Sequence, residues 1–138
     1  MAAMSAQELM RHVERLRSSV SVWSVGRWSA APRPLPGLLP TSTSCAGVAR
    51  HLVQLLADAG ADAEGRARRE VPDTGNDLVL ADQILVLGRD FVLADPADDL
   101  RRAVLDEVLL HRAELDGARA GRDVLQRAAA ACPLRRNP

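Results

Sequence analysis

Apolar residues recur at helical spacing along most of this chain, and they are densest in its middle. Residues 77–95, DLVLADQILVLGRDFVLAD, would place apolar side chains on nearly every face of a helix. Because a helix that is apolar all round must be covered by other elements, the pattern predicts a central helix over about 78–93. A β-hairpin turning at Gly88 is the alternative, since periodicity alone does not separate a short buried helix from buried strands. The run lacks the alternation of a strand and has helix signals on both sides, which favours the helix.

An amphipathic helix is predicted near the N-terminus. Residues 5–8, SAQE, have the spacing of a capping box, in which the serine and glutamate side chains each accept a hydrogen bond from the other residue's amide. Apolar residues then recur every three or four positions, which predicts a helix over about 6–19. Residues 18–28 are rich in serine and β-branched side chains, and the pattern leaves open whether they are helical or extended.

Further helices are predicted on both sides of the central one. A serine and threonine run at 41–44 supplies an N-cap for a helix that ends at Gly60 or Gly65. Asp95, followed by a proline, fits the start of a helix after the central one. A short last helix is expected over 124–131. Together these elements predict an all-α fold, a small four- to five-helix bundle.

The length of 138 residues fits a single helical domain, 1–138, in three parts. These parts are an N-terminal amphipathic helix with a tryptophan segment (6–28), a proline-rich linker (29–44) and a helical core (45–132). The linker holds four prolines, which remove amide donors and favour extended backbone. We therefore expect a semi-rigid spacer that lets the first helix cross the domain or swap onto a neighbouring subunit.

Composition narrows the classes of function. The chain has no lysine, which excludes Schiff-base and pyridoxal-phosphate enzymes and a lysine-dependent phosphate loop. The N-terminus lacks the pattern of a secretory signal, and the charged residues within 77–95 make membrane insertion costly. Cys45 and Cys132 lack metal-pair spacing and are interpreted as buried side chains in a reducing compartment. A cytoplasmic protein without membrane contact is expected.

The net charge of zero conceals a segregation of charge along the chain. Residues 1–36 hold five arginines against two acids, and residues 118–138 hold five arginines against one acid. The middle of the chain holds the remaining eight arginines against fifteen acids. Either both basic ends fold back on the acidic body, or one of them captures an acidic partner. The first interpretation is the simpler one because it needs no partner.

The three histidines lie on or beside the apolar stripes of three predicted helices. His12, His51 and His111 could therefore direct imidazoles into a common interior, where they would suit zinc or another borderline metal. The Glu-x-x-His spacing of carboxylate-bridged metal proteins is missing, and histidines at a stripe edge commonly satisfy a buried polar contact. We assign no metal and no cofactor, and we keep the three histidines as weak metal-ligand candidates.

Trp23, Arg27 and Trp28 are the candidate partner-binding residues. Tryptophan and arginine are enriched where proteins bind one another, and these three lie in the least regular helical region, beside the prolines. Trp23 continues the apolar stripe of the first helix. We therefore expect Trp23 to face inward and Trp28 to be the freer ring.

No catalytic motif is found. Cys45 at a helix start could be a nucleophile with a lowered pKa, but the sequence does not place a partner histidine. Arginines after Gly60 faintly suggest a helix-turn-helix, yet the zero net charge argues against nucleic acid. The sequence therefore predicts a non-enzymatic protein-interaction module that binds a protein partner or itself, with self-association through the N-terminal helix. A small-molecule or metal carrier using interior histidines is the alternative, and a DNA-binding regulator is a third possibility.

Overall fold

The computed structural model describes residues 2–131, and in this range every named element is helical. The elements are α1 (Ala2–Val20), α2 (Val25–Ser29), α3 (Cys45–Glu64), the 3-10 turn η1 (Asp77–Val79), α4 (Leu80–Leu93), α5 (Asp98–Asp116) and α6 (Arg122–Ala131). The predicted all-α fold is confirmed, and the hairpin alternative is wrong because its residues lie in α4. Within the described range, no helix combines the length and the apolarity that a membrane span requires.

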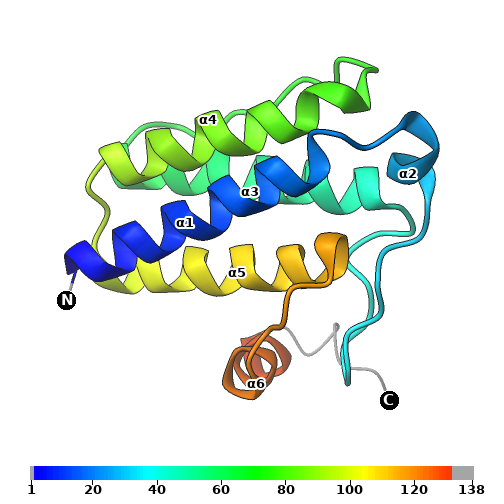
Figure 1. Ribbon diagram of the computed structural model, residues 1–138. Helices are drawn as coiled ribbons and strands as arrows, with labels where there is room; N and C mark the ends of the chain where they lie inside the picture. The colour runs from blue at the N-terminus through cyan, green and yellow to red at the C-terminus, as the bar shows by residue number, and fades with distance from the viewer. Residues whose placement is uncertain (1, 132–138) are drawn as a thin grey trace.

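The four long helices form the bundle, and each packs against two of the others (Figure 1). Helix α3 packs on α4 and α5, and α1 completes the ring by packing on the same two helices. The apolar stripe of α1 is fully buried at Leu9, Val13 and Leu16. The N-terminal helix therefore contributes to the core of its own chain.

Local sequence signals correctly mark the ends of α3, and a similar side-chain cap starts η1. The Ser44 side-chain oxygen accepts from the Gly47 amide at 3.1 Å, and Gly65 ends the helix with a φ of 69°, where a side chain would be strained. The Asn76 side chain accepts from the Leu78 amide at 3.0 Å and so caps η1. These interactions form between neighbours in the chain, which is why the sequence predicts them.

Two predicted helix starts are wrong. Helix α1 already begins at Ala2, because the residues before the expected capping box are strong helix formers. Helix α5 begins at Asp98 rather than at Pro96, because a buried guanidinium organises the preceding turn. Arg101 donates from Nη1 to Asp98 at 2.7 Å and from Nη2 to the Pro96 carbonyl oxygen at 2.8 Å. Asp95 adopts a positive φ of 51° in this turn.

The apolar helix α4 is one of four bundle members and is not covered on all sides. Ile84 and Phe91 are fully buried, but Val86 is 54% exposed and Leu93 is 82% exposed. Helix α4 packs on α1 and α3 among the helices, so one face is left to solvent. The expectation of complete covering is therefore wrong. Helix α3, with ten buried residues against five in α4, is the more enclosed of the two.

Gly88 has a packing role in place of the turn considered above. A Cβ atom at this position would lie 2.9 Å from Cγ1 of Val13 in α1. Glycine within a helix costs about 1 kcal/mol relative to alanine. The close approach of α1 and α4, which buries Val13 completely, offsets that cost.

The proline-rich segment folds back on the bundle instead of extending as a spacer. Leu35 and Leu38 form an isolated antiparallel bridge. The Arg33 amide donates to the Glu114 carbonyl oxygen at 2.8 Å, at the C-terminal end of α5. Leu38 is 5% exposed and packs with apolar residues of α5 and α6. The proline-rich segment, residues 29–44, therefore packs against these helices, and we call it the strap. The predicted semi-rigid polyproline spacer is wrong.

Candidate functional site

Two of the three candidate histidines meet between α3 and α5. His51 Nδ1 and His111 Nε2 lie 2.8 Å apart. The two rings are nearly parallel, with an angle of 10° between their planes and 5.1 Å between their centroids. His111 is fully buried, whereas His51 reaches the surface.

The hydrogen bonds of this pair define which ring nitrogen donates. His111 Nδ1 lies 2.6 Å from the Glu107 carbonyl oxygen, which can only accept. Nδ1 of His111 therefore carries a proton, and when this ring is neutral its Nε2 accepts from Nδ1–H of His51. The two imidazoles form a directed chain from the surface to a helix carbonyl. This arrangement satisfies the buried histidine without a metal ion.

His12 makes a separate contact between α1 and α5. Its Nδ1 lies 2.8 Å from Arg112 Nη1, and because a guanidinium only donates, Nδ1 is the acceptor. Burial, together with the charges of Arg112 and Arg11, lowers the pKa of His12 below its ordinary value of 6.5. Among residues 2–131, no group of three or more histidine, cysteine or acidic side chains is arranged to hold a metal ion. The histidines thus do not form the common site that their sequence positions suggested.

A cleft of about 370 Å³ opens between α3 and α5 beside His51. Its floor is apolar and includes Leu55, Leu100 and Val104. Clefts that bind small molecules fall in this range of size. Whether the cleft can bind a small molecule also depends on whether the charged groups at its rim are free to contact a ligand.

The rim of the cleft is occupied by a network that fastens the loop after α3. Gln54 donates to Asp58 at 2.8 Å and accepts from the Val71 amide at 2.8 Å. Arg68 makes two hydrogen bonds to Asp62, at 3.0 and 2.6 Å. These charges hold residues 66–71 against α3, so they already have a structural role.

The tryptophan segment is arranged in the opposite way to the prediction. Trp28 is 1% exposed and belongs to the core, whereas Trp23 is only partly buried. The rings meet edge to face with centroids 4.9 Å apart, and the guanidinium carbon of Arg27 lies 4.7 Å from the Trp23 ring centroid. The reversal arises because α1 ends at Val20 and a new helix begins at Val25, which interrupts the helical register before Trp23.

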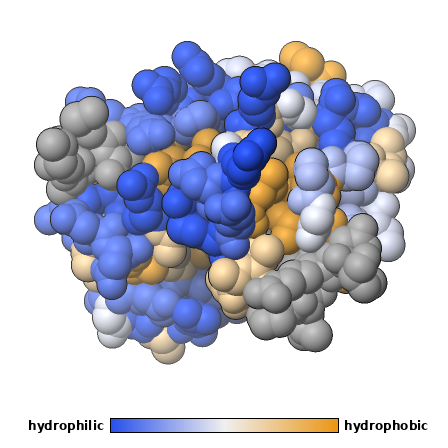
Figure 2. All heavy atoms as spheres, turned by 90° about the horizontal axis from the view of Figure 1, so that it is seen from below, coloured by the Kyte–Doolittle hydropathy of each residue, from blue (hydrophilic) through white to orange (hydrophobic). Residues whose placement is uncertain are grey.

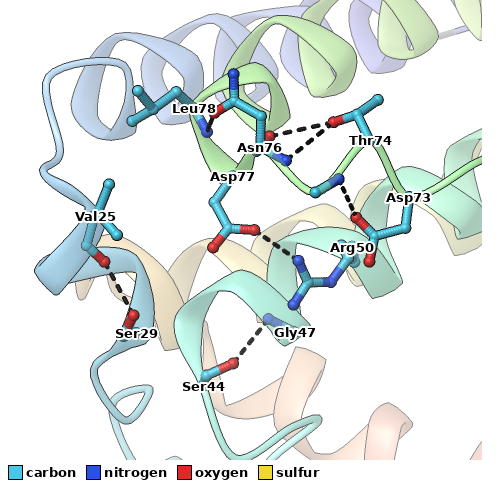
Figure 3. A network of polar contacts seen from close by, with 11 residues as sticks. Val25, Ser29, Ser44, Gly47, Arg50, Asp73, Thr74, Asn76, Asp77 and Leu78 are labelled. Carbon is cyan, nitrogen blue, oxygen red and sulfur yellow. Dashed lines mark hydrogen bonds and ion pairs between the residues drawn. The ribbon is translucent and has the colours of Figure 1, made fainter.

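Exposed apolar side chains lie on α2, on the residues just before it and on η1, at the same end of the bundle. Val22 is 83% exposed, Val25 is 63% exposed and Leu78 is 52% exposed. Helix α2 contacts η1, and Figure 3 shows Val25 and Leu78 at the same end of the bundle, on these two elements. We refer to Val22, Trp23, Val25, Arg27 and Leu78 as the α2 patch. The sequence interpretation missed Leu78 because it assigned this residue to the covered central helix.

The turn that carries Leu78 is fixed to α3 by polar contacts (Figure 3). Arg50 of α3 donates to Asp77 at 2.7 Å. Asp73 accepts from the Gly75 amide at 2.9 Å, and Gly75 has a positive φ of 72°. The leucine is therefore held at the surface by an ordered turn, so its exposure is a property of the fold.

Two alternatives that the sequence already disfavours have no support in the structure. Burial raises the pKa of the Cys45 thiol, the opposite of what an activated nucleophile needs. This thiol lies 3.7 Å from the Ala31 carbonyl oxygen, to which it donates. Residues 66–76 contain no helix, so the arginines after α3 do not belong to a helix-turn-helix. The interpretation of Cys132 as a buried side chain concerns a residue outside the described range.

Comparisons with known proteins identify no relative. No protein-family model matches the chain. Neither the curated protein sequences nor the solved structures include a match.

Proposed function

We propose that the protein is a non-enzymatic association module in which two copies of the chain bind through the α2 patch. The supporting observation is the set of three protruding apolar side chains around Trp23, of which Val22 is 83% exposed. Exposed apolar side chains that lie close together are typical of protein–protein contact surfaces. Tryptophan and arginine beside it add the residue types that contribute most to binding energy.

The charges near the α2 patch support a second copy as the partner. Arg27 belongs to the basic N-terminal part of the chain, and no acid among residues 2–131 lies within 4.0 Å of it. Asp77 lies in η1, which contacts α2, and it pairs with Arg50 of α3 in its own chain. A two-fold interface sets one surface against itself, so the basic and acidic groups of one copy can face those of the other.

The three partner-binding residues predicted from the sequence have two different roles in this proposal. Trp23 and Arg27 belong to the contact surface. Trp28 is buried beneath them and supports α2 from the core. The alternative of a metal carrier has less support because His12 does not join the His51–His111 pair.

Sedimentation velocity over a series of concentrations tests this proposal. We expect the wild-type chain to form a reversible dimer. Val25→Asp should weaken self-association at least about tenfold, because the new charge would be buried in the interface. Val86→Asp is the matched control, since Val86 is 54% exposed but lies on α4, outside the α2 patch.

The control should dimerise like the wild type. A wild-type chain that stays monomeric at every concentration would refute self-association. Equal effects of the two aspartate substitutions would place the interface elsewhere or show a general effect of charge.

A further inference from the structure

Two adjoining grooves lie between the strap and α6, and we call them the α6 grooves. One has a volume of about 420 Å³ and is lined by Arg33 and Arg119 among others. The second has a volume of about 500 Å³ and includes Arg122. They share Leu125 and other apolar lining residues. Figure 2 views the molecule from below, the side on which α6 lies in Figure 1, and shows apolar areas between polar side chains on this face.

The three arginines of the α6 grooves are not used by the fold as ion-pair partners. In the part of the chain that the structure describes, no acidic group lies within 4.0 Å of Arg33, Arg119 or Arg122. The nearby acids have other partners, since Asp116 pairs with Arg112 and Asp123 with Arg127. This differs from the α3–α5 cleft, where the arginine at the rim fastens a loop.

Arg33 is held at the grooves from two sides. Its amide donates to the Glu114 carbonyl oxygen at 2.8 Å. Its guanidinium packs over Gly117, where a Cβ atom would lie 2.9 Å from Nε and 3.0 Å from Cζ. The glycine therefore leaves the room that this side chain occupies.

Arg122 stands at a position that does not favour a cation. It is the first residue of α6, where the positive end of the helix dipole opposes another positive charge. Arg33, Arg119 and Arg122 thus bring three positive charges to the lining of the grooves, while Asp123 in the first turn of α6 pairs with Arg127. Beneath them, Leu38 and Leu125 provide recessed apolar surface, because Leu38 is buried and Leu125 is partly buried.

We propose that the α6 grooves bind a single-chain amphiphile with a carboxylate head, that is, a long-chain carboxylic acid. The planar guanidinium groups match the geometry of a carboxylate. The chain lies over Leu125 and the other apolar residues that the two grooves share, and it replaces water there. The size of each groove falls within the range of small-molecule sites. This site is separate from the α2 patch, so either proposal can fail without the other.

Isothermal titration calorimetry with dodecanoate below its micellar concentration tests the assignment. We expect saturable binding of one dodecanoate per chain. Dodecyltrimethylammonium, which has the same chain length and the opposite charge, should not bind. The double variant Arg119→Gln/Arg122→Gln should bind dodecanoate at least about tenfold more weakly, because two charge-assisted contacts are lost.

Arg89→Gln is the matched control, because Arg89 is an exposed arginine on α4 without an ion pair in the described range. It should bind dodecanoate like the wild type. Equal binding of the cationic detergent, or unchanged affinity in the double variant, would overturn the proposal. Failure to bind dodecanoate together with sedimentation on vesicles of anionic phospholipid would identify a membrane-docking face, which also contradicts it. The same double variant should self-associate like the wild type when it is measured by sedimentation velocity.

Discussion

The α2 patch and the α6 grooves differ in how far their apolar side chains reach the surface. In the α2 patch these side chains protrude, since Val22 and Val25 are 83% and 63% exposed. In the α6 grooves they are recessed, and Leu38 is only 5% exposed. Protruding apolar groups suit a second protein surface, whereas recessed ones beneath arginines suit a small amphiphile. The local backbone therefore determines which kind of partner an apolar surface can bind.

Removing the buried ring beneath the α2 patch should have the largest effect. Trp28→Ala should lower the free energy of unfolding by about 3–5 kcal/mol, because it leaves a large cavity. Trp23→Ala should cost only about 1 kcal/mol, since it loses mainly an edge-to-face contact and a cation–π contact. Urea denaturation followed by circular dichroism measures both. Similar losses in the two variants would contradict the distinction between a supporting and a surface tryptophan.

The grooves allow the same contrast between two neighbouring leucines. Leu38→Ala should lower the free energy of unfolding by about 2–4 kcal/mol, because Leu38 fills the cluster between the strap and α6. Leu39 is 41% exposed, so Leu39→Ala should change stability by no more than about 0.5 kcal/mol. Urea denaturation followed by circular dichroism measures the stability of both variants. If Leu38→Ala were as mild as Leu39→Ala, the strap would not be packed and the grooves would lose their floor.

A smaller effect is expected from pH, and it involves neither surface. Because burial lowers the pKa of His12 in the folded protein, the folded state binds fewer protons than the unfolded state. The contribution of His12 to the free energy of unfolding is therefore fully present above pH 6.5. It is lost as the pH falls through the pKa of His12 in the folded state. Urea midpoints between pH 7.5 and 5 should fall less steeply for His12→Gln than for the wild type. Parallel pH profiles would show that His12 is not desolvated.

Features set by neighbouring residues were predictable from the sequence, and features set by packing were not. Ser44 and Gly65 bound α3 through interactions within a few residues, which a sequence pattern reveals. The exposure of Val86 depends on how many helices cover α4, and no periodicity contains that number. Likewise, the contact between His51 and His111 depends on the packing of α3 against α5. Trp23 was misplaced because the break between α1 and α2 shifts the register by a few residues.

Amide hydrogen exchange measured at low and high protein concentration tests the central claim, that two copies associate through the α2 patch. At the concentration where the dimer forms, exchange should slow in residues 21–29 and 73–79. It should stay unchanged in residues 84–93 of α4 and in residues 33–38 of the strap. Protection confined to α4 or to the strap, or no change at all with concentration, would contradict the claim.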